Sequence, residues 1–471
     1  MTASFPASHP VTTRFAPSPT GAMHIGNARA ALFNWLYARH VGGRFLLRIE
    51  DTDRERHSDA AVELIYDTLR WLDLDWDGEP VLQSANAPRH ADVVQALQDK
   101  GHAFRCFLTP EEAEALKTES RALGQALRSP WRDADPSTAP TDRSFVVRLR
   151  VPEGETLVPD VVRGDVRFPN KDLDDMVLLR SDGTPTYNLA VTVDDHDMGV
   201  SHVIRGEEHL SNAARQTLLY TAMDWPVPTF AHLPLIMGDD GQKLSKRHGA
   251  QSVQELQAAG YLPEALRNYL ARLGWGHGND ELFSIEQAVS WFDIVDVVRS
   301  PARFDMAKLN HTNAHYIRLA DVERLAGLVE TILRDQDITL AADVHERLIR
   351  VIPLVRESAQ TLVKLAELTE FAVIDATAPG IPALPPLDAP VRTALADLAN
   401  RLRAVEPFTP AELEPVVRDA AAAADVPLRQ FGPSLRKVLS AGRPAPDLAS
   451  TLAALGRDEA LSRIEAGLAG E

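Results

Sequence analysis

A short stretch near the N-terminus, residues 13–27, constrains the fold of this chain more than any other. Its pattern predicts a strand over Thr13–Ala16, a turn rich in Pro and Gly, and a helix that begins near His24. A tight loop between a strand and a helix N-terminus favours an anion, because the first N–H groups and the dipole of the helix point there. His24 and Asn27 would then lie where phosphate groups bind, although such a turn is also a common structural element.

A second stretch, residues 238–249, gives the first one more weight. It is rich in Gly and carries Lys243 and Lys246, three positions apart. Two ammonium groups in a Gly-rich loop are suited to bind phosphate as point charges. The alternative is an ordinary solvated loop.

Strands and helices alternate through the first hundred residues or so. A strand over Phe45–Glu50 ends in a cluster of charged residues, and Ser58 is a suitable cap for the next helix. This alternation predicts a parallel, doubly wound sheet, in which ligands bind at the carboxyl ends of the strands. The stretches that carry Arg14 and Glu50 both end at that edge.

The middle and the end of the chain follow different patterns. Residues 107–186 predict an inserted α+β segment, after which the sheet is expected to resume at Tyr187 and over Val203–Arg205. From Ser252 onward the pattern is mostly helical, and a Pro-rich joint over Pro379–Pro390 divides the last third into two helical parts.

Composition limits the kind of protein. The chain has 471 residues and a formal net charge of -18, which argues against a protein that coats DNA non-specifically. Its single cysteine, Cys106, excludes an intramolecular disulfide framework and a Cys-based zinc finger. We find no apolar run of membrane-spanning length and no signal-peptide core, and therefore expect a cytoplasmic protein that contacts no membrane.

The two loops together resemble a known family. His24-Ile25-Gly26-Asn27 and Lys243-Leu244-Ser245-Lys246-Arg247 are similar to the two signature motifs of class I aminoacyl-tRNA synthetases. The segments 14–21 and 48–53 resemble the glutamyl/glutaminyl subgroup. Further matching segments are 173–175, 194–196, 205–209 and 300–304. The helical C-terminal third is similar to bacterial glutamyl-tRNA synthetases, and unlike the β-barrel anticodon domains of the glutaminyl enzymes.

The resemblance implies a fold of the α/β class, with a Rossmann-like doubly wound parallel catalytic sheet, an inserted α+β domain and an all-α C-terminal anticodon-binding region. The expected domains are residues 1–106 and 187–250 for the two halves of the catalytic domain, 107–186 for the inserted acceptor-binding domain, 251–320 for a helical stem-contact domain, and 321–378 and 379–471 for two anticodon-binding helical subdomains.

The resemblance also implies an activity, the ATP-dependent attachment of L-glutamate to tRNA(Glu). Glutamate first forms a glutamyl-adenylate, and the glutamyl group then passes to the 2′-hydroxyl of the 3′-terminal adenosine. ATP with Mg²⁺ is the expected cofactor, with no protein ligand named for the metal. The expected protein is a monomer.

The implied site residues fall into three groups. Catalysis is assigned to His24, Lys243 and Lys246. ATP binding is assigned to the same three residues together with Gly26, Asn27 and Glu208. Glutamate binding is assigned to Arg14, Ser18, Glu50, Tyr187 and Arg205. The alternative for Arg205 is a structural ion pair with Glu207 or Glu208. We interpret His196, His202 and His209 as packing or hydrogen-bonding residues.

The sequence departs from the family pattern at two places. Many relatives carry zinc-binding cysteines after the position of Cys106, and here these are missing, so we expect no zinc and no other protein-bound metal. Ser358 stands where many relatives carry an arginine that helps to reject tRNA(Gln), so the enzyme is expected to charge tRNA(Gln) as well unless Arg356 replaces that arginine. Local cations must bind tRNA on this acidic chain. The candidates are Arg347, Arg350, Arg356, Arg429, Arg436 and Lys437, with the neutral Ser358 beside Arg356; the alternative for each is a solvated helix face.

Three other classes compete with this interpretation. A truncated paralogue that glutamylates a tRNA base lacks the anticodon region, which is present here after Leu319. A catalytically inactive tRNA-binding relative would not be expected to keep His24, Lys243 and Arg205. A nucleotidyltransferase that does not act on tRNA remains open, and the tRNA dependence of ATP–pyrophosphate exchange separates it.

Overall fold

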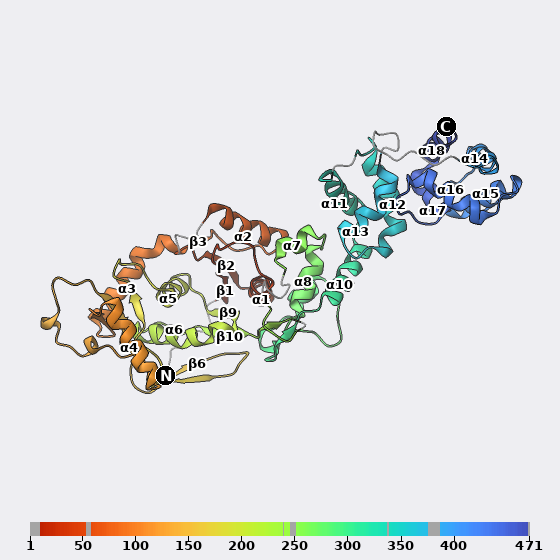
Figure 1. Ribbon diagram of the computed structural model, residues 1–471. Helices are drawn as coiled ribbons and strands as arrows, with labels where there is room; N and C mark the ends of the chain where they lie inside the picture. The colour runs from red at the N-terminus through yellow and green to blue at the C-terminus, as the bar shows by residue number, and fades with distance from the viewer. Residues whose placement is uncertain are drawn as a thin grey trace. The chain divides into compact units, whose positions relative to one another are not determined.

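The computed structural model describes residues 10–52, 58–238, 240–244, 251–336, 339–374 and 387–469. The chain divides into two compact units. The N-terminal unit comprises Met1–Glu255 and Arg267–Asp305, and the helical unit comprises Leu256–Leu266 and Met306–Glu471 (Figure 1). The six predicted domains stay a prediction.

The N-terminal unit combines strands and helices. Its strands are β1 (Thr12–Phe15), β2 (Arg44–Ile49), β3 (Val81–Leu82), β4 (Ala103–Cys106), β5 (Val146–Leu149), β6 (Glu155–Val158), β7 (Val166–Pro169), β8 (Val177–Leu179), β9 (His202–Gly206), β10 (Thr229–Leu233), β11 (Ile236–Met237) and β12 (Ala302–Arg303). Its helices are α1 (Ile25–His40), α2 (Asp59–Trp71), α3 (Ala87–Asp99), α4 (Pro110–Ala122), α5 (Tyr187–Asp197), α6 (Leu210–Ala222) and α9 (Ile285–Trp291). Both α7 (Val253–Ala258) and α8 (Pro263–Ala271) cross the division between the units.

A parallel sheet forms the centre of this unit. Strands β1, β2 and β3 pair in parallel, as do β9 and β10. The two groups meet where the backbone N–H of Ser201 donates to the carbonyl of Thr12 at 3.0 Å, which gives the order β3-β2-β1-β9-β10 (Figure 1). In a doubly wound sheet the chain reverses direction between the two central strands, and ligands bind at that point.

Alternate side chains of β1 show that helices cover both faces of the sheet. Thr13 Oγ1 donates to the carbonyl of Asn34 on α1 at 2.9 Å. The next residue, Arg14, points the other way and binds Asp195 on α5. Since side chains along a strand alternate between faces, α1 and α5 lie on opposite sides of the sheet. The predicted doubly wound α/β fold is confirmed.

The inserted segment forms its own antiparallel structure. Strand β5 pairs with β4 and with β8, and β6 pairs with β7. Just after β6 the chain runs along the edge of β10, where Phe230 N–H donates to Pro159 O and Val161 N–H to Phe230 O, both at 2.9 Å. These bonds seat the inserted segment on the central sheet.

One expected element was wrong. Tyr187 begins helix α5, and the sheet resumes only at β9. The run from Leu189 to Asp195 is buried throughout, so its apolar residues show no helical stripe. A helix that is buried all round cannot be told from a buried strand by periodicity.

The helical unit confirms the expected all-α C-terminal region. Its helices after the division are α10 (Met306–Leu319), α11 (Val322–Arg334), α12 (Val344–Val355), α13 (Leu362–Val373), α14 (Ala389–Leu402), α15 (Pro410–Ala423), α16 (Leu428–Ser440), α17 (Leu448–Leu455) and α18 (Arg457–Ala469). A shared core of buried Leu, Val, Ala and Phe side chains joins them. Among the helices in the described ranges, none has the length and apolarity that a membrane crossing needs.

Candidate active site

A cavity of about 420 Å³ opens at the carboxyl ends of β1, β2 and β9. Of the residues predicted to bind ATP, it is lined by His24, Gly26, Asn27, Glu208 and Lys243. Of those predicted to bind glutamate, it is lined by Arg14, Ser18, Glu50, Tyr187 and Arg205. The fold therefore brings residues from distant parts of the sequence to one place.

The N-terminus of α1 forms one part of the cavity wall. His24 is the N-cap, with extended backbone, and its Nδ1 accepts from the backbone N–H of Gly26 at 3.0 Å. The first turn of this helix carries no acidic residue. The helix dipole thus offers an anion a favourable, uncontested position beside His24.

Lys243 reaches the cavity from the segment after β11. The backbone N–H of Leu244 donates to Ile236 O at 2.9 Å, and Lys243 Nζ lies 3.5 Å from Glu208 Oε1. Burial alone would raise the pKa of Glu208, but its own backbone N–H and the charge of Lys243 lower it below the ordinary value. Glu208 is therefore ionised and holds the lysine at the cavity.

Lys246 lies outside the described residues. The described residues on either side of that stretch both belong to the site, because Leu244 lines the cavity and Ser252 forms a β-bridge with His24.

Arg205 is a buried cation of the cavity and is only 7% exposed. Its Nε donates to His232 Nε2 at 3.2 Å and its Nη2 to Gln216 Oε1 at 2.8 Å, while its guanidinium lies 5.6 Å from the centre of the Phe230 ring. The third nitrogen, Nη1, is buried and has no hydrogen-bond partner within the described parts of the chain. One donor group of a buried fork is thus left for a ligand.

The alternative of a structural ion pair with Glu207 or Glu208 does not describe Arg205. Glu207 pairs with Arg163 of the inserted segment and accepts from the backbone N–H of Leu235 at 2.9 Å. Glu208 pairs with Lys243. Both carboxylates have other cationic partners.

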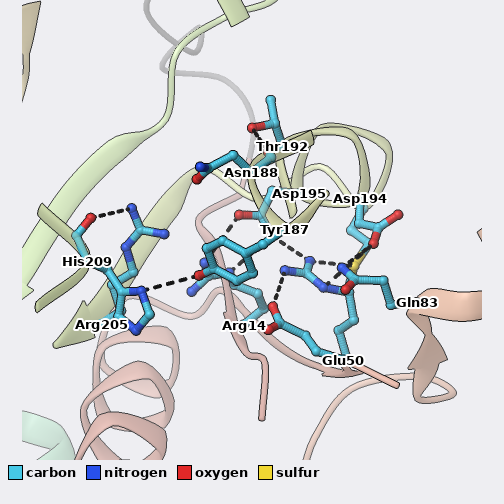
Figure 2. Close-up of polar contacts among 12 residues, drawn as sticks. Arg14, Glu50, Gln83, Tyr187, Asn188, Thr192, Asp194, Asp195, Arg205 and His209 are labelled. Carbon is cyan, nitrogen blue, oxygen red and sulfur yellow. Dashed lines mark hydrogen bonds and ion pairs between the residues drawn. The ribbon is translucent and has the colours of Figure 1, made fainter. Parts of the chain in front are cut away.

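Arg14 and Glu50 belong to a buried charge cluster at the ends of β1 and β2 (Figure 2). Asp195 accepts from Arg14 Nε at 3.1 Å and Nη2 at 3.2 Å, and from Arg48 Nη1 at 2.5 Å. Burial opposes ionisation of Asp195, but Arg14 and Arg48 hold its pKa below the ordinary value. Burial raises the pKa of Glu50, although Arg48 and Arg14 counteract it. A bound ammonium group would relieve that penalty.

Tyr187 lies between Arg205 and the buried charge cluster that contains Arg14 and Glu50 (Figure 2). Its hydroxyl lies 3.3 Å from His209 Nδ1 (Figure 2). Burial and the neighbouring Arg205 lower the pKa of His209 to about 4. His209 is therefore neutral near pH 7 and adds no charge to the cavity.

Comparison with known proteins accounts for this arrangement. Residues 10–311 match the sequence profile described as tRNA synthetases class I (E and Q), catalytic domain. This chain belongs to that family. Residues 324–468 of the synthetase match the profile of an anticodon binding domain. A synthetase of this class uses ATP to attach an amino acid to tRNA.

Curated relatives cover the synthetase from end to end. A glutamate–tRNA ligase from Phenylobacterium zucineum is 57% identical over 470 residues, which is 98% of each chain. A glutamate–tRNA ligase from Caulobacter vibrioides is 54% identical over 479 residues, which is 99% of each chain. The crystal structure of a glutamate tRNA ligase from Elizabethkingia meningosepticum, in complex with its amino acid, matches with a TM-score of 0.80 at 28% identity and covers 98% of the synthetase and 100% of that chain.

The predicted tRNA-binding residues lie in the helical unit of the synthetase. Arg356 and Ser358 are the ends of the short helix η8 (Arg356–Ser358), and Ser358 is exposed. Arg429 is exposed on α16, whereas Arg436 Nη1 donates to Ala445 O at 2.8 Å and also to Pro446 O. Arg436 thus also fixes the loop after α16, and its role toward tRNA stays a prediction.

The other predicted features concern histidines and metals. His196 stacks on Trp225 and His202 bonds Ser201 Oγ, in agreement with packing and hydrogen-bonding roles. Within the described ranges, no three His, Cys, Asp or Glu side chains are grouped so that they could hold a metal ion. The absence of zinc stays a prediction.

Sequence reasoning missed several residues that shape the site. His232 bonds to both Asp160 and Arg205, and Asp195 bonds to both Arg48 and Arg14. Of these residues, only Arg48 could have been identified from the sequence, because a charged residue at the inward position of an apolar strand requires a buried partner. Asp160 and His232 gave no such signal.

Proposed function

We propose that this synthetase attaches glutamate to tRNA in two steps. The α-carboxylate of glutamate attacks the α-phosphorus of ATP, and pyrophosphate leaves. The 2′-hydroxyl of the terminal adenosine of tRNA then attacks the activated carbonyl, and AMP leaves. The whole-length relatives named as glutamate–tRNA ligases support this assignment.

The observation that carries the choice of glutamate is the open donor of Arg205. A buried guanidinium with an unpaired Nη1 suits a carboxylate, which accepts charge-assisted hydrogen bonds. Glutamine presents a neutral amide, whose oxygen can accept from Nη1 but which brings no negative charge. The buried charge would then stay uncompensated, which is costly.

The remaining wall residues fit the other parts of the substrates. We assign the α-amino group of glutamate to Glu50, whose buried carboxylate lacks full compensation, and we place Ser18 and Tyr187 beside the amino acid. Arg14 belongs to the same charge cluster as Glu50, but its Nε and Nη2 donate to Asp195. The charge of Arg14 is therefore already paired with a carboxylate, whereas Arg205 is held by the neutral His232 and Gln216.

Activation needs positioning and charge neutralisation rather than a base. A carboxylate is already ionised at pH 7. His24, Gly26 and Asn27 at the start of α1 would meet the phosphates, with Glu208 near the ribose and Lys243 and Lys246 on the triphosphate. Mg²⁺ would accompany ATP mainly through phosphate and water oxygens.

The direct test is aminoacylation of purified tRNA(Glu) with glutamate or glutamine, together with ATP–pyrophosphate exchange with and without tRNA. We expect glutamate to be charged and glutamine to be rejected. Lys243→Ala should lower kcat about 100-fold or more, as loss of a transition-state donor does. Lys100→Ala is the matched control, because this lysine pairs with Asp224 outside the cavity, and it should keep full activity. Charging of glutamine alone, or exchange that never leads to charged tRNA, would refute the proposal.

We further propose that tRNA(Gln) is also a substrate. The exposed Ser358 supports this, because the family resemblance implies an arginine at that position in enzymes that reject tRNA(Gln). Charging of tRNA(Gln) by the wild type, reduced in Ser358→Arg, is the expected result, and no product on tRNA(Gln) rejects the idea. The monomeric state and the cytoplasmic location remain predictions.

A further inference from the structure

Three buried side chains form a line that ends in the cavity. Asp160 Oδ2 lies 2.5 Å from His232 Nδ1, and His232 Nε2 lies 3.2 Å from Arg205 Nε. The side chains of Asp160 and His232 are completely buried. Asp160 comes from the inserted segment, whereas His232 and Arg205 face each other on β10 and β9.

The chemistry of arginine fixes every proton along this line. A guanidinium only donates, so His232 Nε2 must accept. The proton of the neutral ring is then on Nδ1 and donates to Asp160. Asp160 Oδ2 also accepts from the backbone N–H of His232 at 3.1 Å, and its Oδ1 accepts from Val162 and Arg163 N–H at 2.9 and 2.7 Å.

The line also determines which donor of Arg205 stays open. His232 takes Nε and Gln216 takes Nη2, while Phe230 stacks near the guanidinium. Only Nη1 remains, buried and without a partner in the described ranges. If Nε lost its acceptor, the planar group could turn and present a different edge to the cavity.

We propose that Asp160 and His232 are positioning residues, which hold Arg205 so that its Nη1 meets the side-chain carboxylate of glutamate; this rests on the function proposed above. The orientation of the specificity arginine thereby depends on the seating of the inserted segment against β10. His232 itself touches no substrate. Its lowered pKa, caused by burial and by Arg205, agrees with a ring that stays neutral.

Two substitutions of His232 separate the two halves of the line. In His232→Asn, the amide NH₂ replaces Nδ1–H toward Asp160, but Arg205 Nε loses its acceptor. In His232→Gln, the amide oxygen replaces Nε2 as the acceptor for Arg205, while Asp160 keeps its backbone donors. A purely structural role predicts comparable effects of both.

The assay measures KM for glutamate, KM for ATP and the ratio of kcat/KM for glutamate over glutamine. We expect His232→Asn to raise KM for glutamate about 10-fold or more and to lower the ratio similarly, because a buried donor is left unpaired. We expect His232→Gln to recover part of the loss, because it restores the acceptor of Arg205 but not the donor to Asp160, and KM for ATP to stay within about 2-fold in both. Unchanged KM for glutamate in His232→Asn, or equal increases in the two variants, would overturn the inference.

A matched control comes from the same inserted segment. Asp175 is fully buried and binds Arg132 Nη1 at 2.6 Å and Val151 N–H at 3.0 Å, but it lines no part of the cavity. Asp175→Asn should lower stability and leave KM for glutamate unchanged. A rise in KM for glutamate in this variant equal to that of His232→Asn would mean that any damage to the insert has this effect, and would refute the positioning role.

A measurement on the unmodified protein covers the case in which a variant does not fold. The ¹⁵N NMR shifts of labelled histidine should show that His232 carries a proton on Nδ1 and none on Nε2 from pH 8 to pH 6. The His232 signals are assigned by their absence in His232→Gln or by their coupling pattern. A proton on Nε2, or titration near the ordinary histidine pKa, would overturn the inference. If the wild type charges no glutamate, the proposed function fails, and the NMR result still decides whether this proton arrangement exists.

Discussion

The buried carboxylate of Asp195 gives the sharpest test of how the site is held together. It accepts three hydrogen bonds, two from Arg14 and one from Arg48, and its side chain is 3% exposed. Asp195→Asn removes the negative charge and replaces one acceptor oxygen by an NH₂ group with almost the same volume. The packing is preserved, so the change reports on charge and hydrogen bonds.

The magnitude follows from burial. Breaking a buried ion pair by removing one partner costs about 3–5 kcal/mol, because the remaining charge is left uncompensated. Glu50 and Asp194 still offset part of the charge of Arg48, at 3.4 and 3.9 Å. We therefore expect a loss near the lower end, about 3 kcal/mol of unfolding free energy.

A control on the same helix isolates the effect of burial. Asp197 also accepts two hydrogen bonds from one arginine, Arg89, but these side chains are 35% and 46% exposed. Exposed pairs contribute about 0–1 kcal/mol, so Asp197→Asn should destabilise the protein far less.

Urea unfolding followed by tryptophan fluorescence is the suitable assay. All 7 tryptophans lie within the N-terminal unit, so the signal reports on the unit that contains Asp195. The Asp195→Asn protein should also show a raised KM for glutamate, because Arg14 loses its anchor. Equal losses of stability for the two variants would refute the reasoning that burial, and not the number of hydrogen bonds, determines the cost.

Two further predictions concern pH and metal. Burial lowers the pKa of His202 to about 4, so between pH 6.5 and 4 the unfolded chain binds a proton that the folded chain does not. The free energy of unfolding should therefore fall by about 3 kcal/mol as the pH drops through this range. The same acid titration of His202→Gln should show a smaller fall in this free energy. Cys106 is buried and contacts Ser129 Oγ at 3.2 Å, so we expect Cys106→Ser to keep its activity and metal analysis of the purified protein to find no stoichiometric zinc; one zinc per chain would contradict this.

Much of the site could be predicted because its residues belong to compact motifs. His24 caps helix α1, Glu50 follows directly on β2 and Arg205 lies near the end of β9, and the carboxyl ends of parallel strands meet at one edge. The residues that orient them could not be predicted. Asp160 meets His232 only because the inserted segment lies along β10, a pairing that depends on contacts between chain segments far apart in the sequence.

The strand assignment at Tyr187 failed for a related physical reason. Helix α5 is covered on all sides, so its sequence carries neither a helical stripe nor strand alternation. Two of its three acidic residues, Asp194 and Asp195, look like surface charges in the sequence, but they are the buried partners of His90 and of two arginines.

The amino-acid sequence by itself determined the class of the fold, the family, and the chemical groups that line the cavity, because these follow from periodicity and from short local motifs. Only the tertiary structure decided which partners hold Arg14 and Arg205 in the cavity. Arg14 and Arg205 are the same residue type, but Arg14 is held by the carboxylate of Asp195, whereas Arg205 is held by a neutral imidazole and an amide, with no carboxylate partner among the described residues. That difference depends on partners brought together across the fold, which no local pattern encodes.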